Sequence, residues 1–160
     1  MVSHQRLIDL LSYDPETGFF RWRETQRGRT AGSIAGCDDN GYIAIYIDNK
    51  KYRAHRLALF YVYGVWPKVV DHKNRVKSDT RLQNLRSCTQ KQNSENQGLS
   101  PKNTSGVRGV TWNKKEKRWA AQIKHHGRLH HLGWYKDFKE AVEVRVRKEK
   151  ELFTFSEVSA

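Results

Sequence analysis

The residues best suited to catalysis lie in the middle of the chain, where an Asp-His pair is followed at fixed intervals by two asparagines. Asp71 and His72 end an apolar run typical of a strand, Asn84 follows twelve residues after His72, and Asn93 follows nine residues later. A strand-end pair, a hairpin and a helix that folds back over it can bring Asp71 and Asn93 to one point. Each of these two side chains offers a hard oxygen, so the spacing predicts a divalent-cation site.

The chemistry expected of this site is hydrolysis of a phosphodiester. Two protein oxygens suit Mg²⁺, with Mn²⁺ as an alternative, because Mg²⁺ completes its coordination with water and phosphate oxygens and can stabilise the departing oxygen. His72 is expected to be the general base, since an imidazole with a pKa near about 6.5 accepts a proton from water at neutral pH. Asn84 cannot titrate, and we expect it to orient the loop carrying His72. An asparagine where a third histidine would stand disfavours Zn²⁺.

These residues resemble the HNH homing endonucleases of phages, in the branch whose last motif position is Asn, over roughly residues 40–97. The resemblance implies a ββα-metal fold in which the Asp and the final Asn hold the metal, the His is the base and the middle Asn is structural. The chain departs from the family's pattern at Lys73, where an apolar residue is usual, and at 79–80, where an Asp-Asn pair is usual. The motifs are Tyr-Arg-Ala-His-Arg-Leu, Trp-Pro, Asp-His, Asn-Leu-Arg and Gln-Asn, at 52–57, 66–67, 71–72, 84–86 and 92–93.

A strong positive charge accompanies these motifs. The 160 residues include 30 Lys and Arg against 17 Asp and Glu, a formal net charge of +13. Such a field favours a nucleic acid as partner, although ribosomal, histone-like and membrane-surface proteins share it. His55 is a candidate for a phosphate contact, with a hydrogen-bonded structural histidine as the alternative. The candidates for contact with the DNA backbone, with a solvated charged surface as the alternative, are Lys73, Arg75, Lys77 and Arg86.

Cysteine usage and hydropathy limit the other classes of protein. Cys37 and Cys88 stand alone, so neither a structural zinc site nor a disulfide framework is predicted. The first residues lack an apolar signal region, and no run approaches the roughly 18 apolar residues of a membrane span. We expect a soluble protein of the cytoplasm, which is the bacterial host's cytoplasm if a phage encodes the chain.

The element pattern predicts an α+β protein with two domains. A polar Gly/Pro/Ser stretch separates a nuclease domain at 1–97 from a second domain at 105–155, with the linker at 98–104. In the first domain the core motif at 52–97 follows an N-terminal helix and hairpins at 1–51. The expected elements are a helix around 7–11, a strand at 19–22, a hairpin over 42–54, a helix over 56–63, strands at 107–112, 118–125 and 128–134, and a helix from 138 to about 150.

In the second domain, the strand at 118–125 alternates between two kinds of side chain. Trp119, Ala121 and Ile123 share one face, which we expect to pack on the helix, and Gln122 and Lys124 share the other, which suits readout of a DNA major groove. The four histidines at 125–126 and 130–131 alternate between the faces, so no metal site is expected there.

The motifs of this domain resemble the AP2 domain, a three-stranded antiparallel sheet with one packed helix, over about residues 104–152. They are Gly-Val-Arg-Gly-Val, Trp-Ala-Ala-Gln-Ile and Leu-Gly-Trp-Tyr, at 106–110, 119–123 and 132–135. The plant domain's additional Arg and Trp contacts are not reproduced around Lys114 and Lys115, so its target sequence does not transfer. The resemblance implies DNA-facing positions at Arg108, Gln122, Lys124 and His131, with Thr111 and Asn113 as further candidates.

The function expected from the sequence is a metal-dependent DNA endonuclease of the homing type. One catalytic motif per chain predicts that a monomer nicks one strand of double-stranded DNA, while a double-strand break requires a dimer or two events. No obligatory protein partner and no membrane are expected. Two alternatives stay open: a sequence-specific DNA-binding regulator with an inactive nuclease domain, and an RNA-binding or architectural basic protein. The presence of all four motif residues favours the enzyme.

Overall fold

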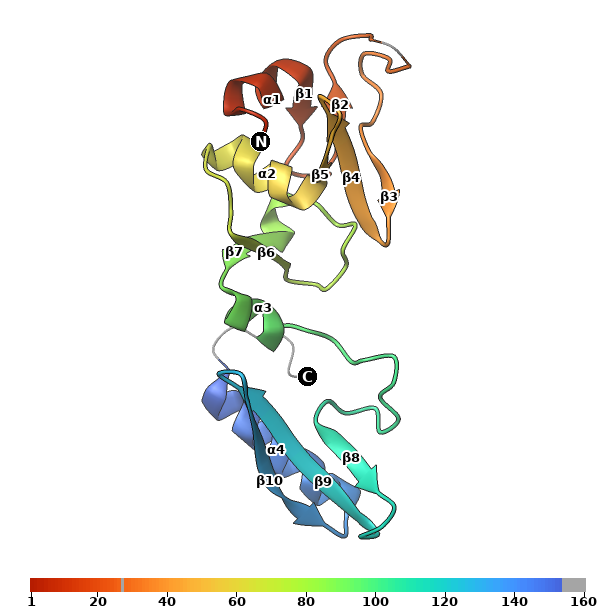
Figure 1. Ribbon diagram of the computed structural model, residues 1–160, viewed down its shortest axis with the longest axis vertical. Helices are drawn as coiled ribbons and strands as arrows, with labels where there is room; N and C mark the ends of the chain where they lie inside the picture. The colour runs from red at the N-terminus through yellow and green to blue at the C-terminus, as the bar shows by residue number, and fades with distance from the viewer. Residues whose placement is uncertain (27, 154–160) are drawn as a thin grey trace. The chain divides into compact units, whose positions relative to one another are not determined.

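Two compact units make up the chain in a computed structural model that describes residues 1–26 and 28–153 (Figure 1). The first unit is Met1–Gln90 and the second begins at Lys91. This division lies ahead of the linker that the sequence predicts at 98–104, and it assigns the helix carrying Asn93 to the second unit. The described elements are helices and small antiparallel sheets, which agrees with the predicted α+β class.

An N-terminal helix and hairpin open the first unit. Helix α1 (His4–Leu10) begins at Ser3, whose hydroxyl accepts the Arg6 N–H, and it leads into β1 (Leu11–Tyr13), which pairs with β2 (Phe20–Trp22). The Tyr13 hydroxyl donates to the carbonyl of Thr80 at 2.7 Å, and the Thr80 hydroxyl donates to the carbonyl of Gly18 at 2.6 Å. The N-terminal hairpin therefore braces the loop that follows His72.

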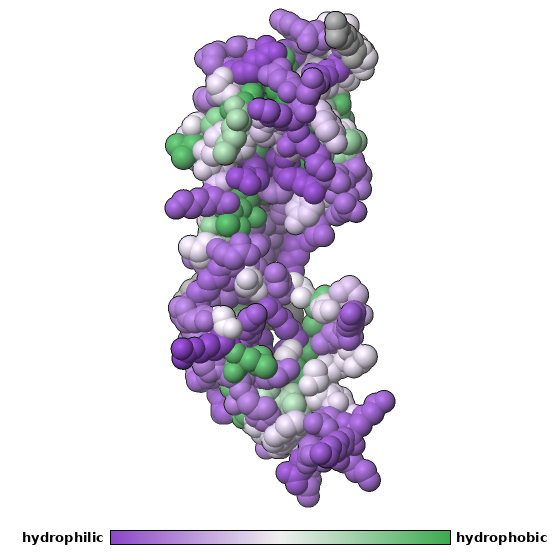
Figure 2. Space-filling view, viewed as in Figure 1, coloured by the Kyte–Doolittle hydropathy of each residue, from purple (hydrophilic) through white to green (hydrophobic). Residues whose placement is uncertain are grey.

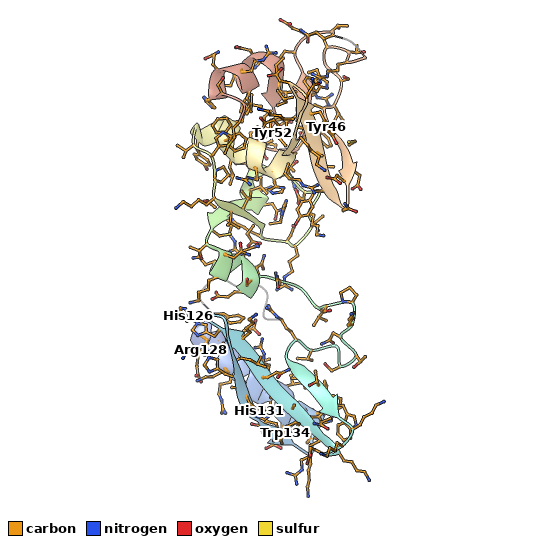
Figure 3. The ribbon with its side chains drawn as sticks, in the orientation of Figure 1. Tyr46, Tyr52, His126, Arg128, His131 and Trp134 are labelled. Carbon is orange, nitrogen blue, oxygen red and sulfur yellow. The ribbon has the colours of Figure 1, made fainter. Side chains whose placement is uncertain are left out.

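The core of the first unit lies between a three-stranded sheet and a helix. The sheet has the order β3 (Cys37–Asp39), β4 (Tyr42–Ile47), β5 (Lys50–Arg53), and α2 (Ala54–Tyr63) follows directly and ends at Gly64, whose φ of 69° favours glycine. Ile45 and Ile47 are fully buried with Leu57 of α2. Tyr52, labelled in Figure 3, stacks on Trp66 at 5.8 Å between ring centroids.

A two-stranded ribbon presents the Asp-His pair. Strand β6 (Val69–His72) pairs antiparallel with β7 (Leu85–Cys88), which follows the short 3₁₀ helix η1 (Leu82–Asn84). The register sets Asp71 opposite Arg86 and His72 opposite Leu85. The predicted hairpin is therefore confirmed, and its connection is the loop 73–81.

The second unit contains a three-stranded sheet covered on one face by a helix. After α3 (Gln90–Glu95), strands β8 (Val110–Asn113), β9 (Arg118–His125) and β10 (Arg128–Tyr135) form the order β10-β9-β8, and α4 (Phe138–Leu152) lies across them (Figure 1). Val110, Ala121 and Ala141 form the buried centre, and Trp119 packs on Phe138 with ring centroids 4.6 Å apart. The predicted helix, packed face and last two strands are confirmed, whereas the first strand begins at Val110 and not at 107.

Hydrophilic side chains cover most of the face of the molecule seen in Figure 2. None of the described helices is long and apolar enough to cross a membrane.

Candidate active site

Asp71 is held by an arginine of the neighbouring strand. Nε and Nη2 of Arg86 lie 2.9 and 2.8 Å from Oδ2 of Asp71. Both side chains are largely buried, with exposed fractions of 14% for Arg86 and 7% for Asp71, so this is a charge-assisted pair shielded from water. Arg86 was expected to contact the DNA backbone. In the structure its guanidinium pairs with the Asp71 carboxylate and fixes the orientation of the carboxylate oxygens.

His72 lies among aromatic rings beside this pair. Its ring centroid is 4.8 Å from that of His55, in an edge-to-face arrangement, and 6.0 Å from that of Tyr42. Burial lowers the pKa of His72 below its ordinary value, although Asp71 and Asp79 act in the opposite direction. The imidazole is therefore neutral at physiological pH, which is the form that a general base requires.

His55 occupies the interior at the start of α2 and is only 7% exposed. Among the described residues no hydrogen-bond partner lies within reach of its Nδ1. Burial first, and then electrostatic interaction with His72, Arg56 and Arg53, lowers the pKa of His55 to about 3. The structure thus places His55 as a neutral packing partner of His72, which is closer to the structural alternative than to a phosphate contact.

The buried pair of imidazoles predicts an acid-sensitive fold. Because the unfolded His55 takes up a proton near pH 6.5 and the folded one only near pH 3, the unfolded state binds more protons between these values. The free energy of unfolding should then fall by up to about 1.4 kcal/mol per pH unit on acidification below pH 6.5, with His72 acting in the same direction. Urea titrations from pH 6.5 to 4.5 measure this slope, and His55→Phe should flatten it. An equal slope in both proteins would contradict the assignment.

Asn84 bridges two parts of the loop that follows His72. Its Oδ1 accepts the N–H of Asn74 at 3.0 Å and its Nδ2 donates to the carbonyl of Asp79 at 2.9 Å, while its own carbonyl accepts the N–H of Lys73. The side chain is 7% exposed. A buried amide that satisfies two backbone groups of one loop has the geometry expected of the orienting residue.

Removal of this bridge should cost stability. Asn84→Ala leaves the Asn74 N–H and the Asp79 carbonyl without their partner, so we expect the free energy of unfolding to fall by about 1–3 kcal/mol. Gln83→Ala, an exposed neighbour in η1, is the matched control and should stay within about 0.5 kcal/mol of the parent. Chemical denaturation measures both variants; equal losses in the two would remove the special role of Asn84.

A tyrosine and two cations lie next to the histidines, and the sequence did not single them out as a group. The ring centroid of Tyr42 is 5.3 Å from that of His55. The Arg53 guanidinium lies 4.8 Å and the Lys77 ammonium 5.0 Å from the centre of the same ring. Arg53 is also paired with Asp39 at 2.7 Å. The available signals were Tyr42 at the start of the predicted hairpin and Arg53 just before the predicted helix.

The loop after His72 carries the other predicted basic contacts. Lys73 is half-buried, whereas Arg75 and Lys77 are exposed, and Arg75 has a positive φ of 64°. All three residues belong to the loop 73–81, which the hydrogen bonds of Asn84 hold in place. This concentration of positive charge suits contact with a phosphate backbone.

The two residues predicted to bind a metal ion both carry hard oxygen donors. Asp71 supplies a carboxylate in the first unit, and Asn93 lies on α3 in the second. In the described part of the chain, no group of three or more His, Cys, Asp or Glu side chains could hold a metal ion. One carboxylate and one amide oxygen match Mg²⁺, which retains water and phosphate ligands, better than the closed sets of a structural zinc.

The uncovered face of the second unit's sheet carries several of the predicted DNA-facing residues. Gln122 lies opposite His131, and Thr111 and Trp134 both lie opposite Ala120. Trp134 is 43% exposed, and its ring centroid is 4.8 Å from that of His131 on the same strand (Figure 3). Lys124, two residues after Gln122 on β9, is exposed and lies opposite Leu129 of β10. The sequence did not assign Trp134 to this face, because the strand's alternation shifts at a bulge between His131 and Gly133.

Two predicted DNA-facing residues have structural partners. Oδ1 of Asn113 accepts the N–H groups of Lys115 and Glu116, so it orders the turn between β8 and β9. The guanidinium of Arg108 donates to three carbonyls at the end of α3.

Comparison with known proteins defines the class. Residues 52–95 match the model of the HNH endonuclease family, and this segment contains His55, Asp71, His72, Asn84 and Asn93. The chain belongs to this family. It is also similar to a phage protein, Protein 3.8 of Escherichia phage T7, with 31% identity over 83 residues that cover 52% of this chain and 68% of that protein. Comparison with solved structures found no significant match.

Proposed function

We propose that the protein is a metal-dependent DNA endonuclease of the homing type, which nicks one strand per monomer at a site chosen by its C-terminal sheet. The observation that carries this proposal is the neutral, buried His72 next to the oriented carboxylate of Asp71, within a segment that matches the HNH family. A decayed nuclease has no need to keep a base, a carboxylate and an orienting asparagine together.

In the proposed mechanism Asp71 and Asn93 hold Mg²⁺, with Mn²⁺ as an alternative. When bound, the ion supplies Lewis-acid stabilisation of the charge that develops on the phosphate and the departing oxygen. His72 accepts the proton of the attacking water. Arg86 keeps the Asp71 carboxylate aligned, and Asn84 holds the loop that carries His72. Lys77, next to the Tyr42 ring, meets a phosphate of the strand being cut.

Site selection is assigned to the uncovered face of the second unit. The shape of a three-stranded sheet with one packed helix supports the likeness to AP2 domains, and a ribbon of this kind can enter a major groove. Gln122 suits adenine and Lys124 suits guanine, while His131 and Thr111 lie on the same face. Trp134 adds an apolar surface for a thymine methyl group. The net charge of +13 supplies the sequence-independent attraction.

Cleavage of a supercoiled plasmid that carries the target tests the proposal. With Mg²⁺ the dilute monomer should convert supercoiled DNA to the nicked circle, and EDTA should abolish the reaction. Linear product without a nicked intermediate would contradict one cut per monomer.

Binding without cleavage separates the two alternatives. Tight, sequence-specific binding of duplex DNA with no cut under any divalent cation would favour the regulator. Preference for single-stranded RNA over duplex DNA at one matched salt concentration would favour the RNA-binding protein, since electrostatic affinities compare only at equal salt.

A further inference from the structure

The side chain of Arg108 donates three hydrogen bonds to carbonyls at and just beyond the C-terminal end of α3. Its Nη1 donates to the carbonyls of Glu95 and Gln97, both at 3.0 Å, and its Nη2 donates to the carbonyl of Ser94 at 2.8 Å. The last carbonyls of a helix have no partner within the helix, and the helix dipole makes that end negative. The guanidinium satisfies two such groups, the carbonyls of Ser94 and Glu95, and also binds the carbonyl of Gln97 just beyond the helix, so it is a cap made by a residue outside the helix.

Helix α3 depends on this kind of support. It has six residues, well below the roughly 12–15 that make an isolated helix even marginally stable in water. Its sequence, Gln-Lys-Gln-Asn-Ser-Glu, has no apolar residue that packing could bury. The cap reaches it from the segment just before β8, the first strand of the sheet, because Arg108 precedes Val110 by two residues.

We propose that Arg108 is a positioning residue for catalysis: it fixes the helix that carries Asn93, so the sheet domain holds the proposed metal ligand in place as well as selecting DNA. This inference rests on the proposed function for the role of Asn93, but the cap itself does not. It assigns Arg108 a different role from the DNA-facing one that the likeness to AP2 domains implies. Gln122, Lys124 and His131 on the sheet retain the proposed role of contacting DNA.

Three measurements on full-length Arg108→Ala test the proposal. Hydrogen exchange should accelerate at the α3 amides, and the Mg²⁺ concentration for half-maximal nicking should rise by about tenfold, the usual cost of losing a residue that orients a ligand. DNA affinity, measured at fixed salt without Mg²⁺, should stay unchanged. Arg108→Lys should restore part of the α3 protection because one ammonium replaces part of the cap. Arg147→Ala, which removes an equal charge from the exposed side of α4, is the control and should match the parent in all three.

Each other outcome overturns a defined part of the proposal. Unchanged exchange in α3 together with weaker DNA binding would make Arg108 a DNA-reading residue. Faster exchange with an unchanged Mg²⁺ requirement would overturn the link to Asn93. If the parent protein cuts no DNA, the proposed function fails, and hydrogen exchange alone still decides whether Arg108 caps α3.

Discussion

His72→Ala should cut supercoiled plasmid about 10²–10⁴ times more slowly than the parent while it binds the same DNA equally well. The imidazole is neutral because burial lowers its pKa, so its removal takes away a base that is already in the reactive form. Alanine leaves the groups that form the Asp71–Arg86 pair and the Asn84 bridge in place, because these hydrogen bonds join other side chains and backbone groups. Single-turnover rates at saturating DNA measure the change.

His4→Ala serves as a control for the loss of an imidazole. His4 belongs to α1, where its Nε2 lies 2.8 Å from the carbonyl of Tyr61, and it has no place in the proposed chemistry. The His4 variant should cut at the rate of the parent. A His72 variant that also cuts at that rate would remove His72 from the mechanism.

Arg86→Met should destabilise the metal-free protein by about 3–5 kcal/mol and make its stability depend on Mg²⁺. The substitution leaves the Asp71 carboxylate, which is 7% exposed, without the guanidinium that now faces it at 2.8 Å. Methionine fills a similar volume, so the loss reports the unbalanced charge more than a cavity. If Asp71 is a metal ligand, a divalent cation supplies the missing positive charge, and Mg²⁺ should stabilise the variant more than the parent.

An ion pair of the neighbouring loop whose arginine is exposed provides the comparison. Arg81 pairs with Asp79, but the Arg81 side chain is 45% exposed, so Arg81→Met should cost less than about 1 kcal/mol and show no added response to Mg²⁺. Urea titrations of the parent and both variants, each with Mg²⁺ and with EDTA, give the six values that are needed. An Arg86 variant that loses no more than the Arg81 variant, or gains no more from Mg²⁺ than the parent, would contradict the role given to this pair.

Patterning and turn chemistry made the main elements predictable. The hairpin predicted over 42–54 contains β4 and β5, and α2 ends at Tyr63, as predicted. Strands β1 and β3 were not predicted. Leu11–Tyr13 continues the apolar run of α1 without a breaker, and Cys37–Asp39 lacks the β-branched and aromatic residues typical of strands.

The partners of the arginines could not be read from the sequence. Charged residues in a basic chain are expected to face solvent or DNA. The strand register, however, pairs Arg86 with Asp71, and Arg108 donates hydrogen bonds to carbonyls at the end of α3. Both pairings depend on the geometry of loops between segments that lie 11 or more residues apart along the chain. The spacing of the motif residues did predict the elements that present Asp71, His72 and Asn84, because a strand end and a hairpin follow from local patterns.

The dependence of nicking on Mg²⁺ concentration tests the central claim, that Asp71 and Asn93 hold one cation beside His72. Asn93→Ala removes one proposed ligand, so the half-maximal Mg²⁺ concentration should rise by at least about tenfold, and Asn93→Asp, which replaces the amide with a carboxylate, should keep it at or below the parent's value. If Asn93→Ala nicks DNA with the Mg²⁺ requirement of the parent, Asn93 does not hold the ion and the proposed site is wrong.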